Sequence, residues 1–373
     1  MIAKHLLGDD ASDIVDVADR PEEGAAAGPP IPEGTWKAYT DKELFEMTDT
    51  PPEIAIHYAM SEIYDNPNVP TFRTAARRAG GTESRWIVYM DYAPFGTLDV
   101  IIEEYGKTRY GQIPEPFIWY VAESLASACK TLIWGDEPSS DLDSVHASDI
   151  SVSSNDDQAG DGNQKVKGSD DPPLRYVHTD IKPENILLGE AQTAYYPVYK
   201  HPLLADLGDL ATSGGRHKLD TPGYLAPEVE VALPVSGKTM VWEIGIILYS
   251  LTRRVAGIKA QNALDREAPT ELDETIPVED LLEKPSINNE SYKYLYSKRL
   301  EDLIIDCLQT HKRGRPTIAR LHDKAREGLD LINQTQKLLD ADVDTVPQFL
   351  RINFKPDQYP IASKRKRRKP TIS

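Results

Sequence analysis

Four polar side chains at short, regular intervals in residues 176–188 could do chemistry together. They form an H-x-D-x-K-x-x-N series and are His178, Asp180, Lys182 and Asn185. A carboxylate can accept a proton from a reacting group, and carboxylate or amide oxygens are the hard ligands that Mg²⁺ takes. The series fixes four residue types, so it rarely arises by chance in one chain. These residues are therefore the first candidates for an active site.

Three further motifs follow in order. Asp206-Leu-Gly comes after an apolar run, residues 221–228 read TPGYLAPE, and Arg315 begins an Arg-Pro-Thr. Together with the first series, they resemble the signature motifs of the eukaryotic-type serine/threonine protein kinases, from about residue 1 to about residue 330. The resemblance implies an α+β fold of two lobes, with a small, partly truncated sheet-plus-helix N-lobe and a mainly helical C-lobe.

The resemblance also implies the catalytic roles. In phosphoryl transfer the protein mainly aligns a hydroxyl with the γ-phosphate and neutralises charge. Asp180 is then expected to accept the proton of the substrate hydroxyl, while Asn185 and Asp206 bind Mg²⁺. Lys182 is expected to contact the γ-phosphate, and its combination with Thr221 is typical of serine/threonine kinases. The expected cofactors are ATP and Mg²⁺, and the expected partners are proteins with Ser/Thr acceptors.

Other residues are expected to support this site. The resemblance implies that His178 packs beneath the Asp206 turn, and that Glu228 and Arg315 form a buried ion pair in the large lobe. Residues 90–93, MDYA, resemble the hinge between the lobes, with Met90 as gatekeeper and the backbones of Asp91 and Ala93 contacting adenine. The alternative is that these hinge residues only join a strand to a helix.

The N-terminal part departs from the kinase pattern, because no G-x-G-x-x-G loop is present. Residues 1–6, MIAKHL, match the strand that carries the phosphate-binding lysine, so Lys4 is the candidate, the alternative being a solvated lysine. Its usual glutamate partner would fall at His57. Glu53 lies one turn earlier on the same helical face, although the helix dipole would also favour a surface glutamate there. Either the chain is truncated or the small lobe has been partly lost.

Two departures affect the catalytic loop itself. Thr179 stands where many kinases have an arginine, so no cation there awaits an activation-loop phosphate. Residues 240–245 read MVWEIG, and Met240 replaces the aspartate of the D-x-W-x-x-G element. This change removes an acceptor that normally braces the loop.

The net charge of −18 is concentrated in two segments. Residues 8–33 and 136–173 are rich in carboxylates and lack periodicity, which is typical of disordered inserts, although an acidic docking surface is the alternative. We therefore expect a partial N-lobe at 1–91, a C-lobe at 92–340 and an extension with a basic tail at 341–373.

The tail carries six consecutive cations, Lys364 to Lys369. It favours binding to a nuclear import receptor, while contact with nucleic acid, contact with anionic membrane and simple solubilisation remain alternatives. No run of 18 apolar residues and no secretory signal is present. Cys129 and Cys307 lie in apolar stretches typical of buried thiols. We expect an intracellular protein without a transmembrane segment, in the cytoplasm and the nucleus.

Hydrophobic periodicity predicts the elements that would position these residues. The expected helices begin near Pro51 and cover 117–133, 241–251 and 299–308, and the expected strands cover 71–75 and 85–90. Two alternatives to a protein kinase remain. One is a pseudokinase that serves as a binding module, and the other is a small-molecule phosphotransferase that shares the fold.

Overall fold

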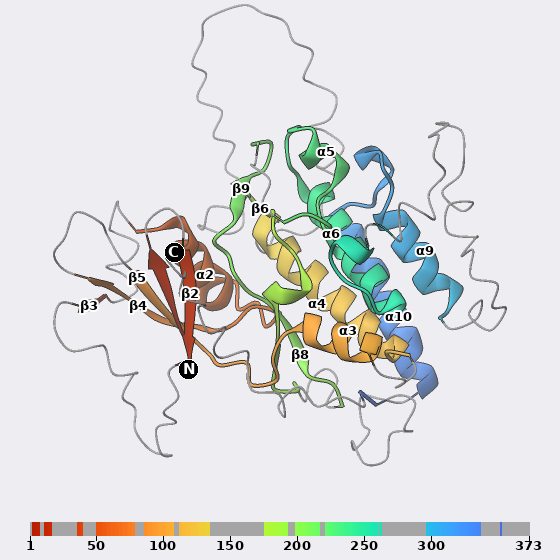
Figure 1. Ribbon diagram of the computed structural model, residues 1–373, viewed down its shortest axis with the longest axis horizontal. Coiled ribbons are helices and arrows are strands. Elements are labelled where there is room, and N and C mark those ends of the chain that lie inside the picture. Colours follow the sequence, from red (N-terminus) through yellow and green to blue (C-terminus); the bar gives the residue numbers. More distant parts are fainter. Residues whose placement is uncertain are drawn as a thin grey trace, which may run out of the picture.

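Strands dominate the first part of the chain and helices the rest. The computed structural model describes residues 2–7, 11–16, 36–39, 50–78, 86–107, 112–134, 175–192, 198–216, 221–260, 262, 296–336 and 351–352. In Figure 1 the segments up to Met90 form a sheet with a helix against it, and the later segments form a larger, mainly helical lobe. This arrangement confirms the expected α+β fold of two lobes.

The small lobe is built on a five-stranded antiparallel sheet with the order β2-β1-β5-β4-β3. Its strands are β1 (Ile2–Leu7), β2 (Ala11–Asp16), β3 (Trp36–Tyr39), β4 (Phe72–Arg78) and β5 (Trp86–Met90). All five side chains of β5 are buried, as expected for a central strand. The strands predicted at 71–75 and 85–90 are confirmed.

Strand β2 corrects one expectation. Residues 8–33 were expected to be a disordered insert, but Ala11–Asp16 pairs antiparallel with β1 along its whole length. The acidic composition therefore hid a short hairpin partner, and the other residues of this segment lie outside the described part.

The helix of the small lobe comprises α2 (Pro52–Tyr58) and a π-helical turn, η1 (Ala59–Ile63). Pro51 and Pro52 stand at its start, where a missing N–H costs nothing. Ile54 packs into a buried cluster with Phe72 and Val88 of the sheet. This helix confirms the expectation from the sequence, except that its second half is π-helical.

The segment after η1 ties the small lobe to the large one. The Asn66 side-chain amide donates to Thr131 Oγ1 at 2.7 Å and to the Ser127 carbonyl at 3.3 Å. The Leu204 N–H donates to the Asn68 carbonyl at 2.8 Å. Asn66 and Asn68 are both buried. The end of the small-lobe helix is therefore fixed to two elements of the large lobe.

The large lobe has a helical core. Its α-helices are α3 (Leu98–Lys107), α4 (Glu115–Trp134), α5 (Pro227–Glu230), α6 (Gly237–Arg253), α9 (Lys298–Cys307) and α10 (Ile318–Gln336), and its 3-10 turns are η3 (Pro183–Asn185) and η5 (Lys312–Gly314). The helices predicted at 117–133, 241–251 and 299–308 are confirmed.

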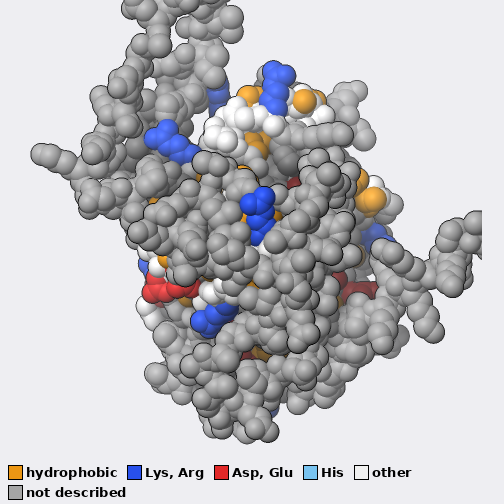
Figure 2. Space-filling model, turned by 90° about the vertical axis from the view of Figure 1, so that its left-hand side faces the viewer, with side chains coloured by type: hydrophobic (Ala, Val, Ile, Leu, Met, Phe, Trp, Pro, Cys, Tyr) orange, Lys and Arg blue, Asp and Glu red, His pale blue; other side chains and the backbone are white. Residues whose placement is uncertain are grey.

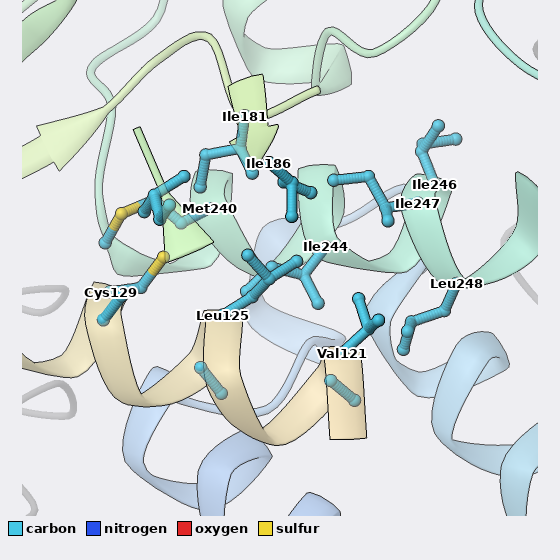
Figure 3. Packing of buried hydrophobic residues seen from close by; sticks show 14 of the residues in the cluster. Val121, Leu125, Cys129, Ile181, Ile186, Met240, Ile244, Ile246, Ile247 and Leu248 are labelled. Atoms are coloured by element: carbon cyan, nitrogen blue, oxygen red, sulfur yellow. The ribbon is translucent and has the colours of Figure 1, made fainter. Parts of the chain in front are cut away.

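Helix α6 is buried almost all round, as its apolar sequence predicted. Figure 3 shows its apolar side chains packed between α4 and the residues of the catalytic loop. Gly245 lets α9 approach closely, because a Cβ atom at this position would lie 2.7 Å from the Cβ of Cys307. A capping box between Ser236 and Thr239 starts the helix. Such a rigid helix is a suitable base for a catalytic loop.

Two small ladders carry the loop residues that the sequence singled out. Strand β6 (Tyr176–His178) pairs with β9 (Leu210–Thr212), and β7 (Ile186–Gly189) pairs with β8 (His201–Leu204). The catalytic loop lies between β6 and β7, and Asp206 lies between β8 and β9. This topology brings the two motifs to the same end of the ladders.

Other findings concern the surface and the cysteines. No helix in the described ranges is long and apolar enough to cross a membrane. Cys129 and Cys307 are free and buried, as expected. Figure 2 shows the face at the left of Figure 1, where those Lys and Arg side chains that the structure describes stand apart from one another.

Candidate active site

Asp180 lies at the centre of a hydrogen-bonded network. Its side chain is 8% exposed. Thr221 Oγ1 donates to Asp180 Oδ1 at 2.6 Å, and Asn185 Nδ2 donates to Asp180 Oδ2 at 3.0 Å. Lys182 Nζ lies 2.6 Å from Asp180 Oδ2 and donates to Thr221 Oγ1 at 3.0 Å. The structure thus brings together four residues that the sequence named, including one from the segment 36 residues beyond Asn185.

The backbone explains why these side chains converge. The 3-10 turn η3 contains Asn185, and the Asn185 N–H donates to the Lys182 carbonyl at 2.9 Å. Asn185 Nδ2 also donates to the Asp180 carbonyl at 2.9 Å. The loop is therefore closed on itself, and Asp180 is held in one orientation by its own neighbours.

His178 supports the loop from below and is fully buried. The Asp180 N–H donates to His178 Nδ1 at 3.2 Å, and His178 Nε2 lies 3.3 Å from the Ala205 carbonyl. Burial lowers the pKa of His178 below its ordinary value, although the Ala205 carbonyl and nearby carboxylates oppose this. A neutral ring with its proton on Nε2 satisfies both contacts. His178 therefore packs against the backbone beside Asp180 and Asp206, as expected for a structural residue.

Asp206 and Asn185 are adjacent in space, because the Ala205 N–H donates to the Asn185 carbonyl at 2.9 Å. Asp206 has φ +60°, a left-handed conformation that aspartate tolerates better than most residues. Strained backbone of this kind is common at functional sites. Both side chains carry oxygen atoms of the hard type that Mg²⁺ takes.

These two side chains fit a magnesium ion. Among the described residues no group of three or more His, Cys, Asp or Glu could hold a metal by itself. Mg²⁺ needs only one or two protein ligands, since it keeps several waters and binds substrate phosphates. Because Asn185 Nδ2 donates to Asp180, the amide oxygen is the atom of Asn185 that would bind the ion.

Glu53 approaches this turn from the small lobe. A Cβ atom built on Gly208 would lie 3.3 Å from both Glu53 Oε2 and Asp206 Oδ1. His57, the position at which the usual glutamate would fall, is buried, and its Nε2 lies 2.6 Å from the Pro70 carbonyl. His57 therefore packs inside the small lobe, whereas Glu53 lies near the candidate active site.

Lys4 and the hinge residues lie on neighbouring strands. Lys4 of β1 stands opposite Val88 of β5 in the sheet. Met90 ends β5 and is buried, as is Ala93. The Asp91 N–H donates to the Thr71 carbonyl at 2.9 Å. Strand order therefore places the Lys4 strand beside the strand that leads into the hinge.

Sequence reasoning did not foresee the side-chain contact of Asp91. Arg73 donates from Nε to Asp91 Oδ1 at 2.7 Å and from the guanidinium to Oδ2 at 2.6 Å. The pair is bidentate but about half exposed, so its contribution to stability is small. No motif in the sequence pointed to it, since the partners lie on different segments.

Thr179 and Met240, the two residues that depart from the kinase pattern at the catalytic loop, each contact a backbone group. Thr179 donates through Oγ1 to the Asp209 carbonyl at 3.0 Å, and its N–H bonds the same carbonyl. The buried Met240 Sδ lies 3.4 Å from the His178 N–H. Sulfur is a weak acceptor. Both positions were recognisable in the sequence, because an uncharged residue stands where a charged one is usual, but the contacts that these residues make could not be predicted.

Glu228 and Arg315 form the expected ion pair. Arg315 Nη1 and Nη2 donate to the two Glu228 carboxylate oxygens at 2.8 and 2.9 Å, and both side chains are buried. Burial by itself would raise the pKa of Glu228, but hydrogen bonds from Arg315 and its charge lower it below the ordinary value. The pair joins the end of the 221–228 segment to the start of α10.

Fold and site together define the protein kinase class. Residues 174–325 match the family described as the protein kinase domain. The chain is 25% identical over 242 residues to the "G2-specific protein kinase nimA" of Emericella nidulans, covering 63% of this chain and 29% of that protein. It is 25% identical over 235 residues to "G2-specific protein kinase nim-1" of Neurospora crassa, covering 63% and 24%.

A third relative is "Serine/threonine-protein kinase nekl-2" of Caenorhabditis elegans, which is 30% identical over 149 residues, or 39% of this chain and 36% of that protein. The chain spans less than a third of the length of the first two relatives. The matches support a eukaryotic-type serine/threonine protein kinase.

Proposed function

We propose that this chain transfers the γ-phosphate of ATP to serine and threonine hydroxyls of protein substrates. The observation that carries the proposal is the network in which Asn185, Lys182 and Thr221 all contact the Asp180 carboxylate. A carboxylate held in this way is a suitable acceptor for a hydroxyl proton, because its orientation costs no further reorganisation.

Each residue of the network has one task in this proposal. Asp180 orients the substrate hydroxyl and accepts its proton. Lys182 places a positive charge where the transferred group carries negative charge. ATP bound with Mg²⁺ supplies the phosphoryl group and neutralises charge, and Asn185 and Asp206 would hold the ion. The Thr221 hydroxyl, 2.6 Å from Asp180 Oδ1, marks the side on which a serine or threonine hydroxyl can approach.

Nucleotide binding is assigned to the small lobe and the hinge. Lys4 would bind the phosphates and pair with Glu53, and Met90 would line the back of the adenine site. The Asp91 N–H is already bonded to Thr71, so the Asp91 carbonyl and the Ala93 backbone are the groups proposed to contact adenine. The β1–β5 pairing and the approach of Glu53 to Gly208 support this assignment.

A second candidate is a pseudokinase that acts as a binding module. The sequence contains no G-x-G-x-x-G loop, and such a loop normally covers the phosphates. The weak acceptor at Met240 also favours this candidate. Against it, Asp180, Asn185 and Asp206 are all retained. The enzyme therefore remains the better supported proposal.

The organisation of the chain is also a proposal. We propose a partial N-lobe at 1–91, a C-lobe at 92–340 and an extension at 341–373. Residues 136–173 and Lys364 to Lys369 lie outside the described residues. The six cations support binding to a nuclear import receptor, and with it a nuclear as well as a cytoplasmic location.

Asp180→Asn and Asp206→Asn in the full-length protein test the proposed function. Each should reduce phosphotransfer to Ser/Thr peptides by several orders of magnitude, since positioning and electrostatics supply most of the acceleration. Asp206→Asn should also weaken Mg²⁺-dependent ATP binding, whereas Asp180→Asn should bind ATP almost normally. Asp302→Asn, at an exposed carboxylate of α9, is the control and should keep wild-type activity.

The wild-type protein decides between the two candidates. If it binds Mg²⁺ and ATP but transfers no phosphate to any Ser/Thr peptide or to itself, the pseudokinase replaces the enzyme. If it transfers phosphate and Asp180→Asn does so equally well, the role of Asp180 is wrong.

A further inference from the structure

Arg73 is the extra residue of a β-bulge in β4, because the pairing with β5 shifts by one residue between Phe72 and Thr74. A bulge interrupts the regular pairing of a strand and redirects the side chain of the inserted residue. The Arg73 side chain extends to Asp91, which directly follows the last residue of β5. The bulge therefore lies where a cation of β4 meets the first residue after the central strand.

Asp91 is held at two points by the same short segment. Arg73 donates from Nε and Nη2 to the two carboxylate oxygens of Asp91 at 2.7 and 2.6 Å. The Asp91 N–H donates to the Thr71 carbonyl at 2.9 Å. A bidentate contact between a guanidinium and a carboxylate fixes the relative orientation of the two planar groups. Asp91 is thus restrained at its side chain as well as at its backbone.

The segment that holds Asp91 is itself fixed to the small-lobe helix. His57 Nε2 lies 2.6 Å from the Pro70 carbonyl, and the Phe72 N–H donates to Ser61 Oγ at 3.1 Å. The side chains of His57, Ser61 and Phe72 are all buried. Hydrogen bonds inside a protein are stronger than in water. Residues 70–73 therefore form a firm support for the hinge.

The other end of the hinge is fixed to the large lobe. The Phe95 N–H donates to the Leu188 carbonyl at 3.1 Å, and the Leu188 N–H donates to the Gly96 carbonyl at 2.9 Å. Residues 92–94 join the two fixed ends. A stretch this short has only a few soft dihedrals, so the positions of its ends determine the course of its backbone.

We propose that Arg73 is a positioning residue for nucleotide binding, which holds the Asp91 backbone where its carbonyl contacts adenine. It acts through Asp91 and does not itself contact the nucleotide. The proposal rests on the proposed function, in which the Asp91 carbonyl and the Ala93 backbone contact adenine. The anchoring of the hinge does not depend on that function. Because the pair is about half exposed, it adds little stability, and its role is to fix orientation.

Two substitutions separate geometry from charge. Arg73→Met removes both donors, whereas Arg73→Lys keeps the positive charge but cannot make the bidentate contact. We expect the Kd for ATP to rise about fivefold or more in Arg73→Met, as for the loss of one hydrogen bond, and more than about twofold in Arg73→Lys. The kcat at saturating ATP should stay within about twofold in both, because Arg73 does not act on the transfer step.

Adenosine shows whether the effect concerns adenine. Since adenosine lacks phosphates, its Kd should rise by the same factor as that of ATP in each Arg73 variant. A rise for ATP alone would mean that Arg73 attracts the phosphates, and no rise would mean that it does not position the hinge, so either result overturns the proposal. Arg299→Met is the matched control, because Arg299 and Glu327 form a similarly exposed pair in α9 and α10. It should bind both compounds as the wild type does.

Hydrogen exchange at the Asp91 amide tests the anchoring without a nucleotide. In Arg73→Met this amide should exchange about fivefold faster or more than in the wild type, while in Arg299→Met it should be unchanged. Equal exchange in the two variants would overturn the proposal even if nucleotide binding is weaker. If the wild type binds neither adenosine nor ATP, the proposed function fails, and the exchange rates still decide whether Arg73 anchors the hinge.

A double-mutant cycle shows whether Arg73 acts through Asp91. Asp91→Ala should raise the Kd for adenosine about as much as Arg73→Met, and the double variant should raise it no further, because the same contact is removed. Additive losses would overturn the proposal. The Tm of Arg73→Met should lie within about 3 °C of the wild type. A larger fall would assign Arg73 to the stability of the lobe and would likewise overturn it.

Discussion

Replacing Arg315 with alanine removes the only cation that the structure shows bonded to the buried Glu228 carboxylate. The guanidinium is fully enclosed and bonds both oxygens of Glu228. It also donates to the carbonyls of Gln309, Lys238 and Thr310 at 2.7, 2.9 and 3.1 Å. The substitution therefore leaves a buried negative charge without its cation, bonded only by the Thr239 hydroxyl among side chains, and removes a donor from three backbone carbonyls.

The contacts of Arg315 determine how much the free energy of unfolding should fall in Arg315→Ala. Removing one partner of a buried ion pair typically costs about 3–5 kcal/mol, because the remaining charge is uncompensated. For a domain of this size, each kcal/mol lowers Tm by about 2–4 °C, so Arg315→Ala should lower it by roughly 10 °C. Arg299→Ala is the control, because Arg299 and Glu327 are 2.7 Å apart but about half exposed. It should cost at most about 1 kcal/mol.

Thermal unfolding followed by circular dichroism measures both variants. A double-mutant cycle with Glu228→Ala adds a second readout, since the double variant should be more stable than the sum of the single losses predicts by about 2 kcal/mol or more. Equal shifts for Arg315→Ala and Arg299→Ala would refute the reasoning, because the Arg315 pair is buried and supported by further hydrogen bonds, whereas the Arg299 pair is about half exposed.

The same pair predicts a dependence on acid. The pKa of Glu228 in the folded state lies below its ordinary value of 4.5. A depressed carboxyl pKa contributes stability that is fully present above 4.5 and is lost as the pH falls through the folded-state value. The free energy of unfolding should therefore decrease below that pH, and Glu228→Gln should weaken this decrease. An unchanged acid profile in Glu228→Gln would contradict the assignment.

Three other expected outcomes concern regulation, nucleotide binding and location. Because Thr179 carries no charge, phosphatase treatment should leave the phosphotransfer rate unchanged, and a fall of about tenfold would contradict this. Lys4→Met should weaken ATP binding without altering Tm, whereas a normal affinity would leave Lys4 as a solvated lysine. Neutral residues at Lys364 to Lys369 should move a fluorescent fusion out of the nucleus, and an unchanged distribution would remove the import proposal.

The catalytic loop could be predicted from the sequence because its chemistry is local. His178, Asp180 and Asn185 fall within a few residues, and each residue type is demanded by a task that few others can perform. The partner segments were placed by the order of the motifs, and the Glu228–Arg315 pair expected in this way is present. Most residues of the candidate site could therefore be predicted from short-range spacing and from the order of the motifs.

The remaining contacts depend on tertiary packing. Nothing in the spacing of Thr179 and Asp209 shows that a backbone carbonyl would receive the hydroxyl. Strand β2 was not predicted because the acidic residues of this segment indicated disorder. Its structure depends instead on pairing with β1.

The hydrogen bonds of Asn66 and Asn68 fix one end of the small-lobe helix, so the helix can rotate only about that end. Its hydrogen bonds to α4 and β8 hold that end against the large lobe. Glu53 lies near the other end, about 15 Å from Ile63 by helical rise. A rotation of the helix by about 10° about this fixed end would move Glu53 by about 3 Å, while Asn66 would hardly move. Small rotations of this helix are therefore converted into the making or breaking of a contact beside Asp206.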